Sequence, residues 1–137
     1  MEIVLSSEGQ TYKVAVFDGD GIGPEIMAPT LRLLNELADK LGSFNFDFNH
    51  VPAGAAHFKE TGESLPKASI DAARAADAVL LSAMGLPSIR KEDGTETTPQ
   101  IELSFDLALY AGVRPVKVCH GQTTPLVEPR WEAIAFG

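Results

Sequence analysis

A short apolar strand that runs into a turn of alternating glycines constrains this fold more than any other feature of the sequence. Residues 12–17 (YKVAVF) are β-branched and aromatic, which predicts a buried strand. The run D-G-D-G-I-G-P follows directly and stops the strand in a tight turn. Apolar residues then recur at spacings of three and four up to Leu41, which predicts an amphipathic helix. Gly23 is expected to cap this helix, and Pro24 suits its first position.

The remaining sequence continues the alternation of strands and helices. Residues 44–51 alternate apolar and polar side chains, which predicts a half-buried strand near a sheet edge. Residues 77–83 form a continuous apolar run, typical of a strand buried on both faces. Further helices are expected at 55–60, 67–76 and 101–110, a surface loop at 84–99, and strands at 113–119 and in the last residues. This order predicts an α/β fold with a mostly parallel sheet flanked by helices.

Composition excludes several classes of function. The net charge of −8 disfavours binding to nucleic acid or to an anionic membrane surface. The single cysteine, Cys119, cannot form an internal disulfide or a cysteine-based zinc cluster. No apolar run approaches the roughly 20 residues of a membrane helix, and the N-terminus lacks the basic start of a secretory signal. We therefore expect a cytoplasmic protein.

Taken alone, the glycine turn has two interpretations. Backbone N–H groups between a strand and a helix can bind a phosphate or a carboxylate. The spacing G-x-G-x-G-P, however, is neither the dinucleotide motif G-x-G-x-x-G nor a P-loop. The glycines could equally serve only the backbone of a tight turn, and spacing leaves both interpretations open.

Four segments in order resemble the β-decarboxylating dehydrogenases, which include the isopropylmalate, isocitrate, homoisocitrate, tartrate and D-malate dehydrogenases. Residues 17–25 resemble the family signature L-P-G-D-G-I-G-P-E, and residues 54–66 resemble its G-G-A…G…L-P stretch. Residues 78–87 are similar to D-A-V-L-L-G-A-x-G-x-P, and residues 109–117 to L-Y-A-N-x-R-P-V-K. The resemblance is nearest to the isopropylmalate, tartrate and D-malate branch.

This resemblance implies an isopropylmalate dehydrogenase-like α/β fold that is incomplete. Family members are considerably longer, so we expect an N-terminal fragment, with residues 1–115 belonging to the first domain and 116–137 starting a truncated second domain. The proton-transfer and metal-binding residues of the family lie beyond Gly137. No catalytic or metal-binding residue is therefore expected within the chain, and the chain alone is expected to be inactive.

The resemblance also implies a reaction. Family members oxidise and decarboxylate a 2-hydroxy acid with NAD or NADP and with Mg²⁺ or Mn²⁺, and the complete protein is expected to form a homodimer. The substrate would be a 3-isopropylmalate-like or a malate- or tartrate-like acid, and NAD is the expected cofactor, with NADP not excluded. The alternative is a truncated or degenerate non-catalytic homologue that retains only a folding or subunit-binding surface.

Site residues follow from the positions that match the family. Arg114 occupies the place of the family arginine in R-P-V-K and is expected to bind a substrate carboxylate. Ser104 stands where family members usually have a second substrate-binding arginine. Loss of that charged hydrogen bond would cost about 1.5–3 kcal/mol, so the chain could take another substrate. Arg90 and Lys91 could supply a replacement cation or serve only as solvated surface charges.

Cofactor contacts are expected from two loops. The resemblance places Asp20, Gly21 and Ile22 of the glycine turn near the nicotinamide ring, where glycine permits close approach. Thr95 and Thr97 resemble loop positions that approach the nicotinamide or its ribose, although ordinary solvation of the loop explains them as well. A zinc site is not expected, because the histidines at 50, 57 and 120 lack partners at metal-ligand spacing.

Overall fold

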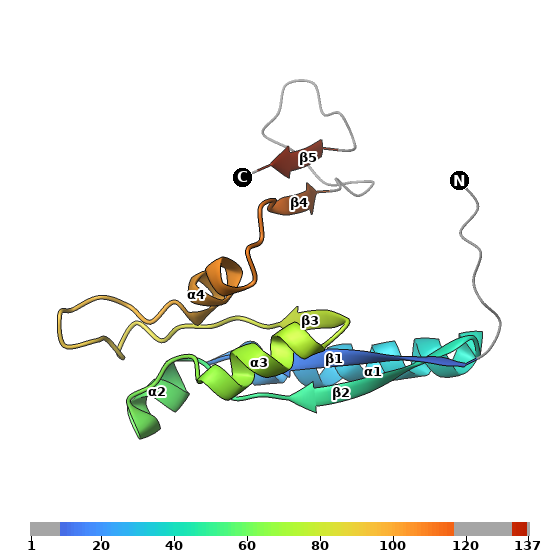
Figure 1. Ribbon diagram of the computed structural model, residues 1–137, viewed down its shortest axis with the longest axis horizontal. Helices are drawn as coiled ribbons and strands as arrows, with labels where there is room; N and C mark the ends of the chain where they lie inside the picture. The colour runs from blue at the N-terminus through green and yellow to red at the C-terminus, as the bar shows by residue number, and fades with distance from the viewer. Residues whose placement is uncertain (1–8, 117–132, 137) are drawn as a thin grey trace. The chain divides into compact units, whose positions relative to one another are not determined.

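The computed structural model describes residues 9–116 and 133–136 (Figure 1). The chain divides into two compact units, Met1–Leu107 and Ala108–Gly137. The predicted domain boundary at residue 115 stays a prediction.

The first unit is built on a parallel sheet of three strands. These are β1 (Gln10–Phe17), β2 (Phe44–His50) and β3 (Ala78–Leu81), in the order β2-β1-β3. The central strand β1 is buried from Val14 to its end, as its β-branched and aromatic sequence predicts. Strand β2 lies at an edge of this sheet and exposes every second side chain, so its alternating pattern is also confirmed.

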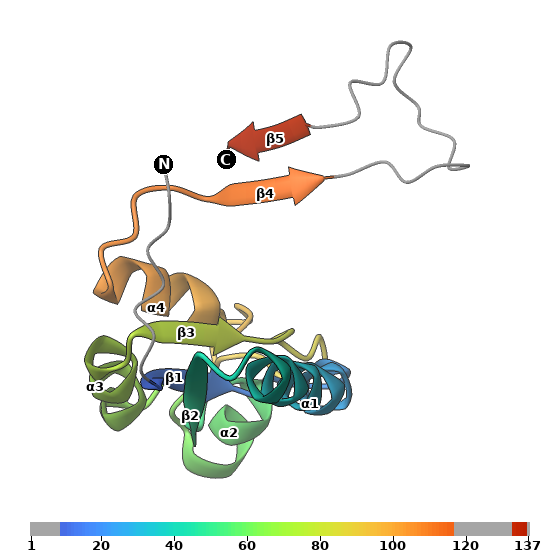
Figure 2. The same ribbon diagram turned by 90° about the vertical axis from the view of Figure 1, so that its right-hand side faces the viewer.

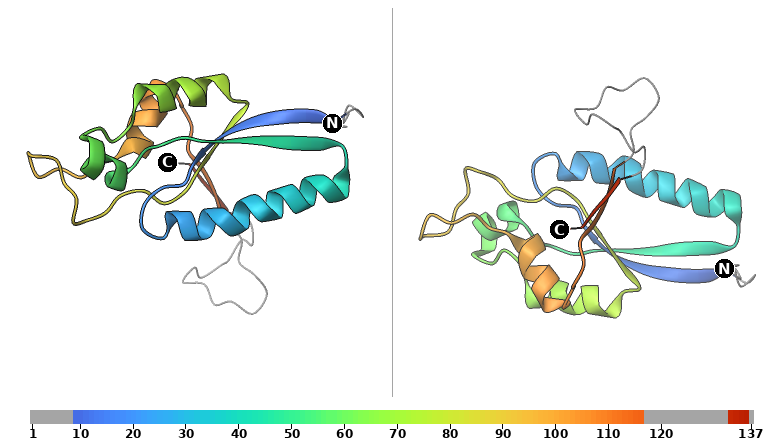
Figure 3. Two further views of the ribbon diagram at one scale, coloured as in Figure 1. Left: turned by 90° about the horizontal axis from the view of Figure 1, so that it is seen from below. Right: turned by 90° about the horizontal axis from the view of Figure 1, so that it is seen from above.

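Helices cover both faces of this sheet (Figures 2 and 3). Helix α1 (Gly23–Leu41) packs through Met27 and Leu31 against one face. Helices α3 (Lys67–Ala75) and α4 (Pro99–Asp106) pack against the other, where Ala73 and Leu103 join the core. The short helix α2 (Ala55–Thr61) follows β2. This arrangement is the α/β fold with a parallel sheet flanked by helices that the sequence predicts.

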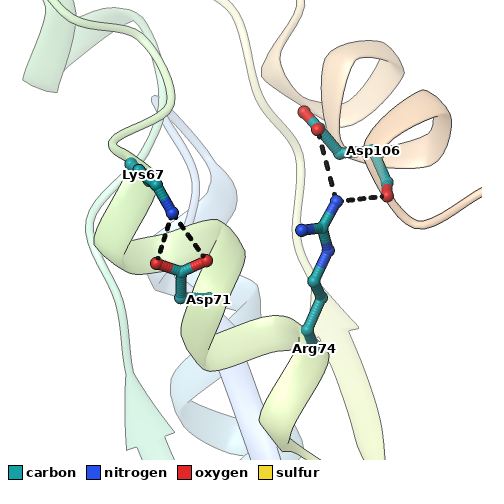
Figure 4. A network of polar contacts seen from close by, with 4 residues as sticks. All are labelled: Lys67, Asp71, Arg74 and Asp106. Carbon is teal, nitrogen blue, oxygen red and sulfur yellow. Dashed lines mark hydrogen bonds and ion pairs between the residues drawn. The ribbon is translucent and has the colours of Figure 1, made fainter.

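A polar contact joins the two helices on the second face (Figure 4). The guanidinium of Arg74 in α3 donates a hydrogen bond of 2.8 Å to the carbonyl of Asp106 and lies 3.6 Å from its carboxylate. Asp106 is the last residue of α4, so the arginine satisfies a carbonyl that the helix leaves free. Lys67 and Asp71, one turn apart on α3, form a separate ion pair at 2.9 Å.

Three details of the sequence-based prediction are wrong. Strand β3 is not buried on both faces: both of its terminal residues are exposed, because among the described strands it pairs only with β1 and lies at an edge of the sheet. Helix α4 ends at Asp106 and does not reach residue 110, because Ala108 adopts a left-handed backbone conformation with φ of 53°. Helix α1 includes Gly23 as its first residue, and Ile22 is the N-cap.

The second unit contains a pair of antiparallel strands. Strand β4 (Val113–Val116) pairs with β5 (Ala133–Phe136), and Arg114 lies opposite Ala135 in the ladder. The predicted strand at the end of the sequence is therefore confirmed. Cys119 and His120 lie outside the described residues.

Candidate functional site

The carboxyl ends of the three parallel strands lie at one edge of the sheet, as parallel pairing requires. The glycine turn, residues 18–22, follows β1 at this edge. Strand β2 ends here at His50, and β3 leads here into residues 82–85. In open α/β sheets, ligands bind in crevices beyond the carboxyl ends of the strands. This edge of the sheet is therefore the candidate site of the first unit.

The side chain of Asp20 joins separate segments of the chain at this edge. Its side chain is buried, with 3% of its surface exposed. One carboxylate oxygen accepts hydrogen bonds from the backbone N–H groups of Ala55, at 2.7 Å, and Gly85, at 2.8 Å. The other oxygen accepts from the N–H of Ala56 at 2.8 Å. A single carboxylate thus ties the glycine turn to the start of α2 and to the loop after β3, and satisfies three N–H donors in doing so.

The glycines around Asp20 allow this close packing. Gly54 has φ of 112°, and a Cβ atom there would lie only 2.6 Å from one carboxylate oxygen of Asp20. In Gly19 and Gly23, a Cβ atom would collide with the carbonyl oxygen of Ala83. That same stretch is held by a 2.8 Å hydrogen bond from the Asp20 N–H to the Ala83 carbonyl. Glycine is therefore required at these positions because other parts of the protein pack directly against the backbone there.

Gly21 and Ile22 form the exposed tip of the turn. Ile22 has 55% of its surface exposed, although it is a large apolar residue. A Cβ atom on Gly21 would meet only the Leu86 side chain, at an ordinary contact distance of 3.5 Å. The turn thus has two kinds of residue: Asp20 is engaged inside the protein, while Gly21 and Ile22 are free to contact a ligand. The predicted cofactor contact of Asp20 stays a prediction, and the structure gives its carboxylate a role in positioning the loops.

Sequence reasoning missed a close pair of titratable side chains at the same edge. Nδ1 of His50 lies 2.7 Å from a carboxylate oxygen of Asp18, and both side chains are about half exposed. The two residues are 32 positions apart, and only the pairing of β1 with β2 brings them together. The signal available in the sequence was that each residue follows or ends a strand expected in the same parallel sheet.

The two threonines predicted to contact a cofactor both lie in the loop between β3 and α4, but they differ in their exposure to solvent. Thr95 is exposed, and the Asp93 carboxylate accepts hydrogen bonds from its hydroxyl, at 2.6 Å, and its N–H, at 2.9 Å. The hydroxyl hydrogen bond is the largest of several effects that lower the pKa of Asp93. Thr97 is buried, with 2% of its surface exposed, so solvation of the loop does not explain it. Its hydroxyl has no hydrogen-bond partner in the described part of the chain.

Three residues considered for substrate binding make other contacts within the first unit. The hydroxyl of Ser104 donates to the carbonyl of Ile101 within α4, at 2.7 Å. Arg90 pairs with Glu96 at 2.8 Å, and Lys91 with Glu102 at 3.2 Å. Both loop cations are therefore engaged with carboxylates of the same unit.

Arg114, the other predicted substrate-binding residue, is exposed on β4 in the second unit. Whether it faces the glycine turn stays a prediction.

Within residues 9–116 and 133–136, no group of three or more His, Cys, Asp or Glu side chains could hold a metal ion. The Asp18–His50 pair supplies only two such groups, and Asp20 is engaged by backbone N–H donors. The same part of the chain contains no helix long and apolar enough to cross a membrane.

Comparison with known proteins identifies relatives. The family model "Isocitrate/isopropylmalate dehydrogenase" matches residues 13–136. The 3-isopropylmalate dehydrogenase of Streptococcus thermophilus is 38% identical over 131 residues, which are 92% of this chain and 37% of that protein. The corresponding enzyme of Synechococcus sp. is 43% identical over 110 residues, covering 78% of this chain and 30% of that protein. The chain thus spans less than two fifths of the length of these relatives.

Solved structures agree with these relatives. A β-decarboxylating dehydrogenase from Thermococcus kodakarensis, crystallised in its apo form, superposes with a TM-score of 0.59 at 31% identity. That match covers 78% of this chain and 30% of the other. Isocitrate dehydrogenase from Methylococcus capsulatus superposes with a TM-score of 0.66 at 24% identity. That match covers 91% of this chain and 33% of the other, and it supports the fold. The chain belongs to the isocitrate/isopropylmalate dehydrogenase family.

Proposed function

We propose that this chain supplies the cofactor-facing edge of an NAD-dependent oxidative decarboxylase that acts on a 2-hydroxy acid. The observation that carries this proposal is that residues of the glycine turn have two different roles. Asp20 is buried and fixes the turn to two other loops, while Gly21 and Ile22 project at the carboxyl end of the parallel sheet. A rigid turn with an exposed glycine and an exposed apolar side chain suits contact with a flat, partly apolar ring.

The residues of the turn fit the nicotinamide end of NAD or NADP. A bound nicotinamide supplies the acceptor for the hydride that leaves the hydroxyl-bearing carbon of the substrate. In this proposal Gly21 allows close approach to the ring, and Ile22 covers one side of it and excludes water. Asp20 acts as a positioning residue, because its three hydrogen bonds hold the turn against α2 and the loop after β3. Thr95 is a further proposed contact from the loop before α4, since it is exposed, whereas the hydroxyl of Thr97 is buried inside the protein.

The divalent metal of the proposed reaction, Mg²⁺ or Mn²⁺, does not fit the described residues, because they contain no suitable group of ligands. We assign no step of the reaction to a metal held by this part of the chain. We also propose that the 137-residue chain alone does not complete the reaction, and that the active form is a homodimer containing the rest of the family fold.

Recognition of the acid is proposed for Arg114, whose guanidinium can bind a carboxylate through two parallel hydrogen bonds. The identity of the substrate, 3-isopropylmalate-like or malate- or tartrate-like, depends in this proposal on Ser104. A hydroxyl that donates to the Ile101 carbonyl of its own helix provides no positive charge for a second carboxylate. This observation also favours the second candidate, a non-catalytic homologue that retains only the fold.

The test is to join this chain to the part of the Streptococcus thermophilus 3-isopropylmalate dehydrogenase that it does not match. NADH formation would be followed with Mg²⁺ and each of 3-isopropylmalate, D-malate and tartrate. The proposal expects NAD-dependent turnover of at least one acid, with KM for NAD raised about tenfold by Ile22→Ala through lost apolar contact. A folded protein that turns over none of the acids would favour the non-catalytic homologue.

A further inference from the structure

The Asp18–His50 pair adds a second polar feature to the carboxyl edge of the sheet. Nδ1 of His50 lies 2.7 Å from Oδ2 of Asp18, and the histidine and aspartate side chains keep 51% and 43% of their surface exposed. Asp18 is the first residue of the glycine turn, and His50 is the last residue of β2. An ion pair as exposed as this one stabilises a fold only weakly. Stability therefore does not explain the pair.

The backbone already aligns the two strand ends without these side chains. Strands β1 and β2 pair along the whole length of β2, up to the position where Val16 lies opposite His50. Beyond that position the N–H of Val51 donates a 2.9 Å hydrogen bond to the carbonyl of Val16. The Asp18–His50 contact is thus not needed to set the register of β1 and β2.

Residue 18 also departs from the family signature. The signature L-P-G-D-G-I-G-P-E has proline at its second position, where this chain has Asp18. A proline offers no side-chain acceptor, so a histidine at the end of β2 would have no carboxylate to pair with there. The pair is therefore an addition of this chain to the signature.

The contact with Asp18 fixes the orientation of the imidazole. An ionised carboxylate only accepts hydrogen bonds, so Nδ1 of His50 is the nitrogen that donates. In the neutral ring Nε2 then carries a lone pair, on the side of the ring away from Asp18. Neither Nε2 nor the second carboxylate oxygen, Oδ1, has a hydrogen-bond donor among the described residues. The pair thus presents two acceptors at an exposed position.

The topology favours a ribose as the donor. A ribose carries two hydroxyls on adjacent carbons, which can donate to two neighbouring acceptors. In the βαβ units that bind dinucleotides, an acidic side chain roughly 20 residues after the glycine turn accepts a hydrogen bond from a ribose hydroxyl. Strand β1, helix α1 and strand β2 form a βαβ unit, and His50 ends its second strand. The glycine spacing differs from the dinucleotide motif, so the comparison concerns the topology alone.

We propose that Asp18 and His50 together bind the vicinal diol of a ribose. Nε2 of His50 accepts from one hydroxyl and Oδ1 of Asp18 from the other. The inference rests on the proposed function for the identity of the nucleotide, which is NAD. Both riboses of NAD carry the same diol, and the experiment distinguishes them. Asp18 has a second role, because it holds the imidazole in the orientation that directs Nε2 away from the protein.

The test follows the ring nitrogens of His50 by NMR in the isotope-labelled 137-residue chain. At a pH of about 8.5, where imidazoles are ordinarily neutral, the proton should be on Nδ1 before any ligand is added. NAD should then shift the Nε2 signal. Nicotinamide riboside or adenosine should produce the same shift and so identify the ribose. Nicotinamide and 2′,3′-dideoxyadenosine, which lack the diol, should not.

Two substitutions of His50 separate ligand binding from a structural role. His50→Asn keeps a donor near the place of Nδ1 but has no acceptor at the place of Nε2. It should raise the dissociation constant of NAD about fivefold, as the loss of one neutral hydrogen bond permits. His50→Gln places an amide oxygen near the position of Nε2 and should retain most of the affinity. A purely structural pair predicts the reverse, because asparagine keeps the contact with Asp18 better. His57→Asn, at the partly exposed histidine of α2, is the control and should leave the affinity unchanged.

The amide signals of Gly21 and Ile22, followed in the same titrations, test the proposed function separately. If these amides shift with NAD and the His50 ring does not, the inference is overturned and the proposed function stands. If the ring shifts with NAD and with one riboside while both amides stay unchanged, the inference stands and the proposed contact of the turn is overturned. The inference is also overturned if NAD shifts neither, if no riboside shifts the ring, if the compounds without a diol shift it equally, or if His50→Asn binds NAD like the parent chain.

Discussion

The buried carboxylate of Asp20 accepts a 2.8 Å hydrogen bond from the backbone N–H of Gly85, a residue 65 positions further along the chain. The same oxygen binds the N–H of Ala55 at 2.7 Å. Three segments that end or follow separate strands are thereby fixed at one edge of the sheet. The geometry of the candidate site therefore depends on this carboxylate.

Replacing Asp20 with asparagine should destabilise the first unit by about 2–4 kcal/mol, because an amide has one acceptor oxygen and turns its NH₂ toward an N–H donor. Urea unfolding of the 137-residue chain measures this. Asp18→Asn is the control: its carboxylate is 43% exposed and, in the described part of the chain, pairs only with His50, so its loss should cost less than about 1 kcal/mol. Equal costs for the two variants would show that Asp20 does not organise this edge.

Gly54→Ala should be among the most destabilising glycine substitutions. The new Cβ would lie 2.6–2.8 Å from the Asp20 carboxylate, in a backbone with φ of 112°. We expect a loss of at least about 3 kcal/mol in thermal or urea unfolding. Gly62→Ala is the matched control, since Gly62 has φ of 82° but no atom within 4 Å of the added Cβ. Its cost should be only the backbone strain of about 1–2 kcal/mol. A Gly54→Ala chain as stable as the control would rule out the close packing around Asp20.

The Asp93 carboxyl should titrate below its ordinary pKa of 3.8, because Thr95 donates to it from both its hydroxyl and its N–H. A lowered carboxyl pKa stabilises the folded loop above the ordinary value, and this stabilisation is lost as the pH falls through the folded pKa. Thr95→Val removes the hydroxyl bond and should raise the pKa of Asp93 toward 3.8. NMR titration of the carboxyl carbon measures the shift. Thr98→Val, at an N-cap without a side-chain hydrogen bond, should leave it unchanged.

Ser104→Arg tests the proposed cause of altered specificity, in the joined protein that contains the rest of the family fold. A restored guanidinium should lower KM for 3-isopropylmalate or a malate-like acid by about tenfold or more, as one charged hydrogen bond permits. Ser104→Gln, long but uncharged, should give much less of this effect. An arginine variant with the kinetic constants of the parent would remove Ser104 from the account of specificity.

The sequence predicts most of the first unit because local patterns determine it. The β-branched and aromatic run in β1 and the alternation in β2 are confirmed, and so is the helical spacing of α1. Strand β3 is present where the sequence predicts a strand, but its predicted burial on both faces is wrong, because an apolar run reports hydrophobicity and not sheet order. A strand at the edge of this unit and one in its centre have the same sequence pattern.

The site is less predictable because its contacts join distant segments. The glycine turn follows from the pattern, but the exposure of Ile22 does not, and the three N–H partners of Asp20 come from residues 35 to 65 positions away. The Asp18–His50 pair likewise depends on strand register. Ala108 ended α4 against its helical spacing, through a left-handed backbone conformation that alanine seldom adopts.

The most direct test of the central claim is an NMR titration of the isotope-labelled 137-residue chain with NAD. If the exposed tip of the turn contacts the cofactor, millimolar NAD should shift the amide signals of Gly21 and Ile22, and the Asp20→Asn variant should lose these shifts. Shifts confined to other parts of the chain, or unperturbed signals for both residues at the highest NAD concentration reached, would contradict the account.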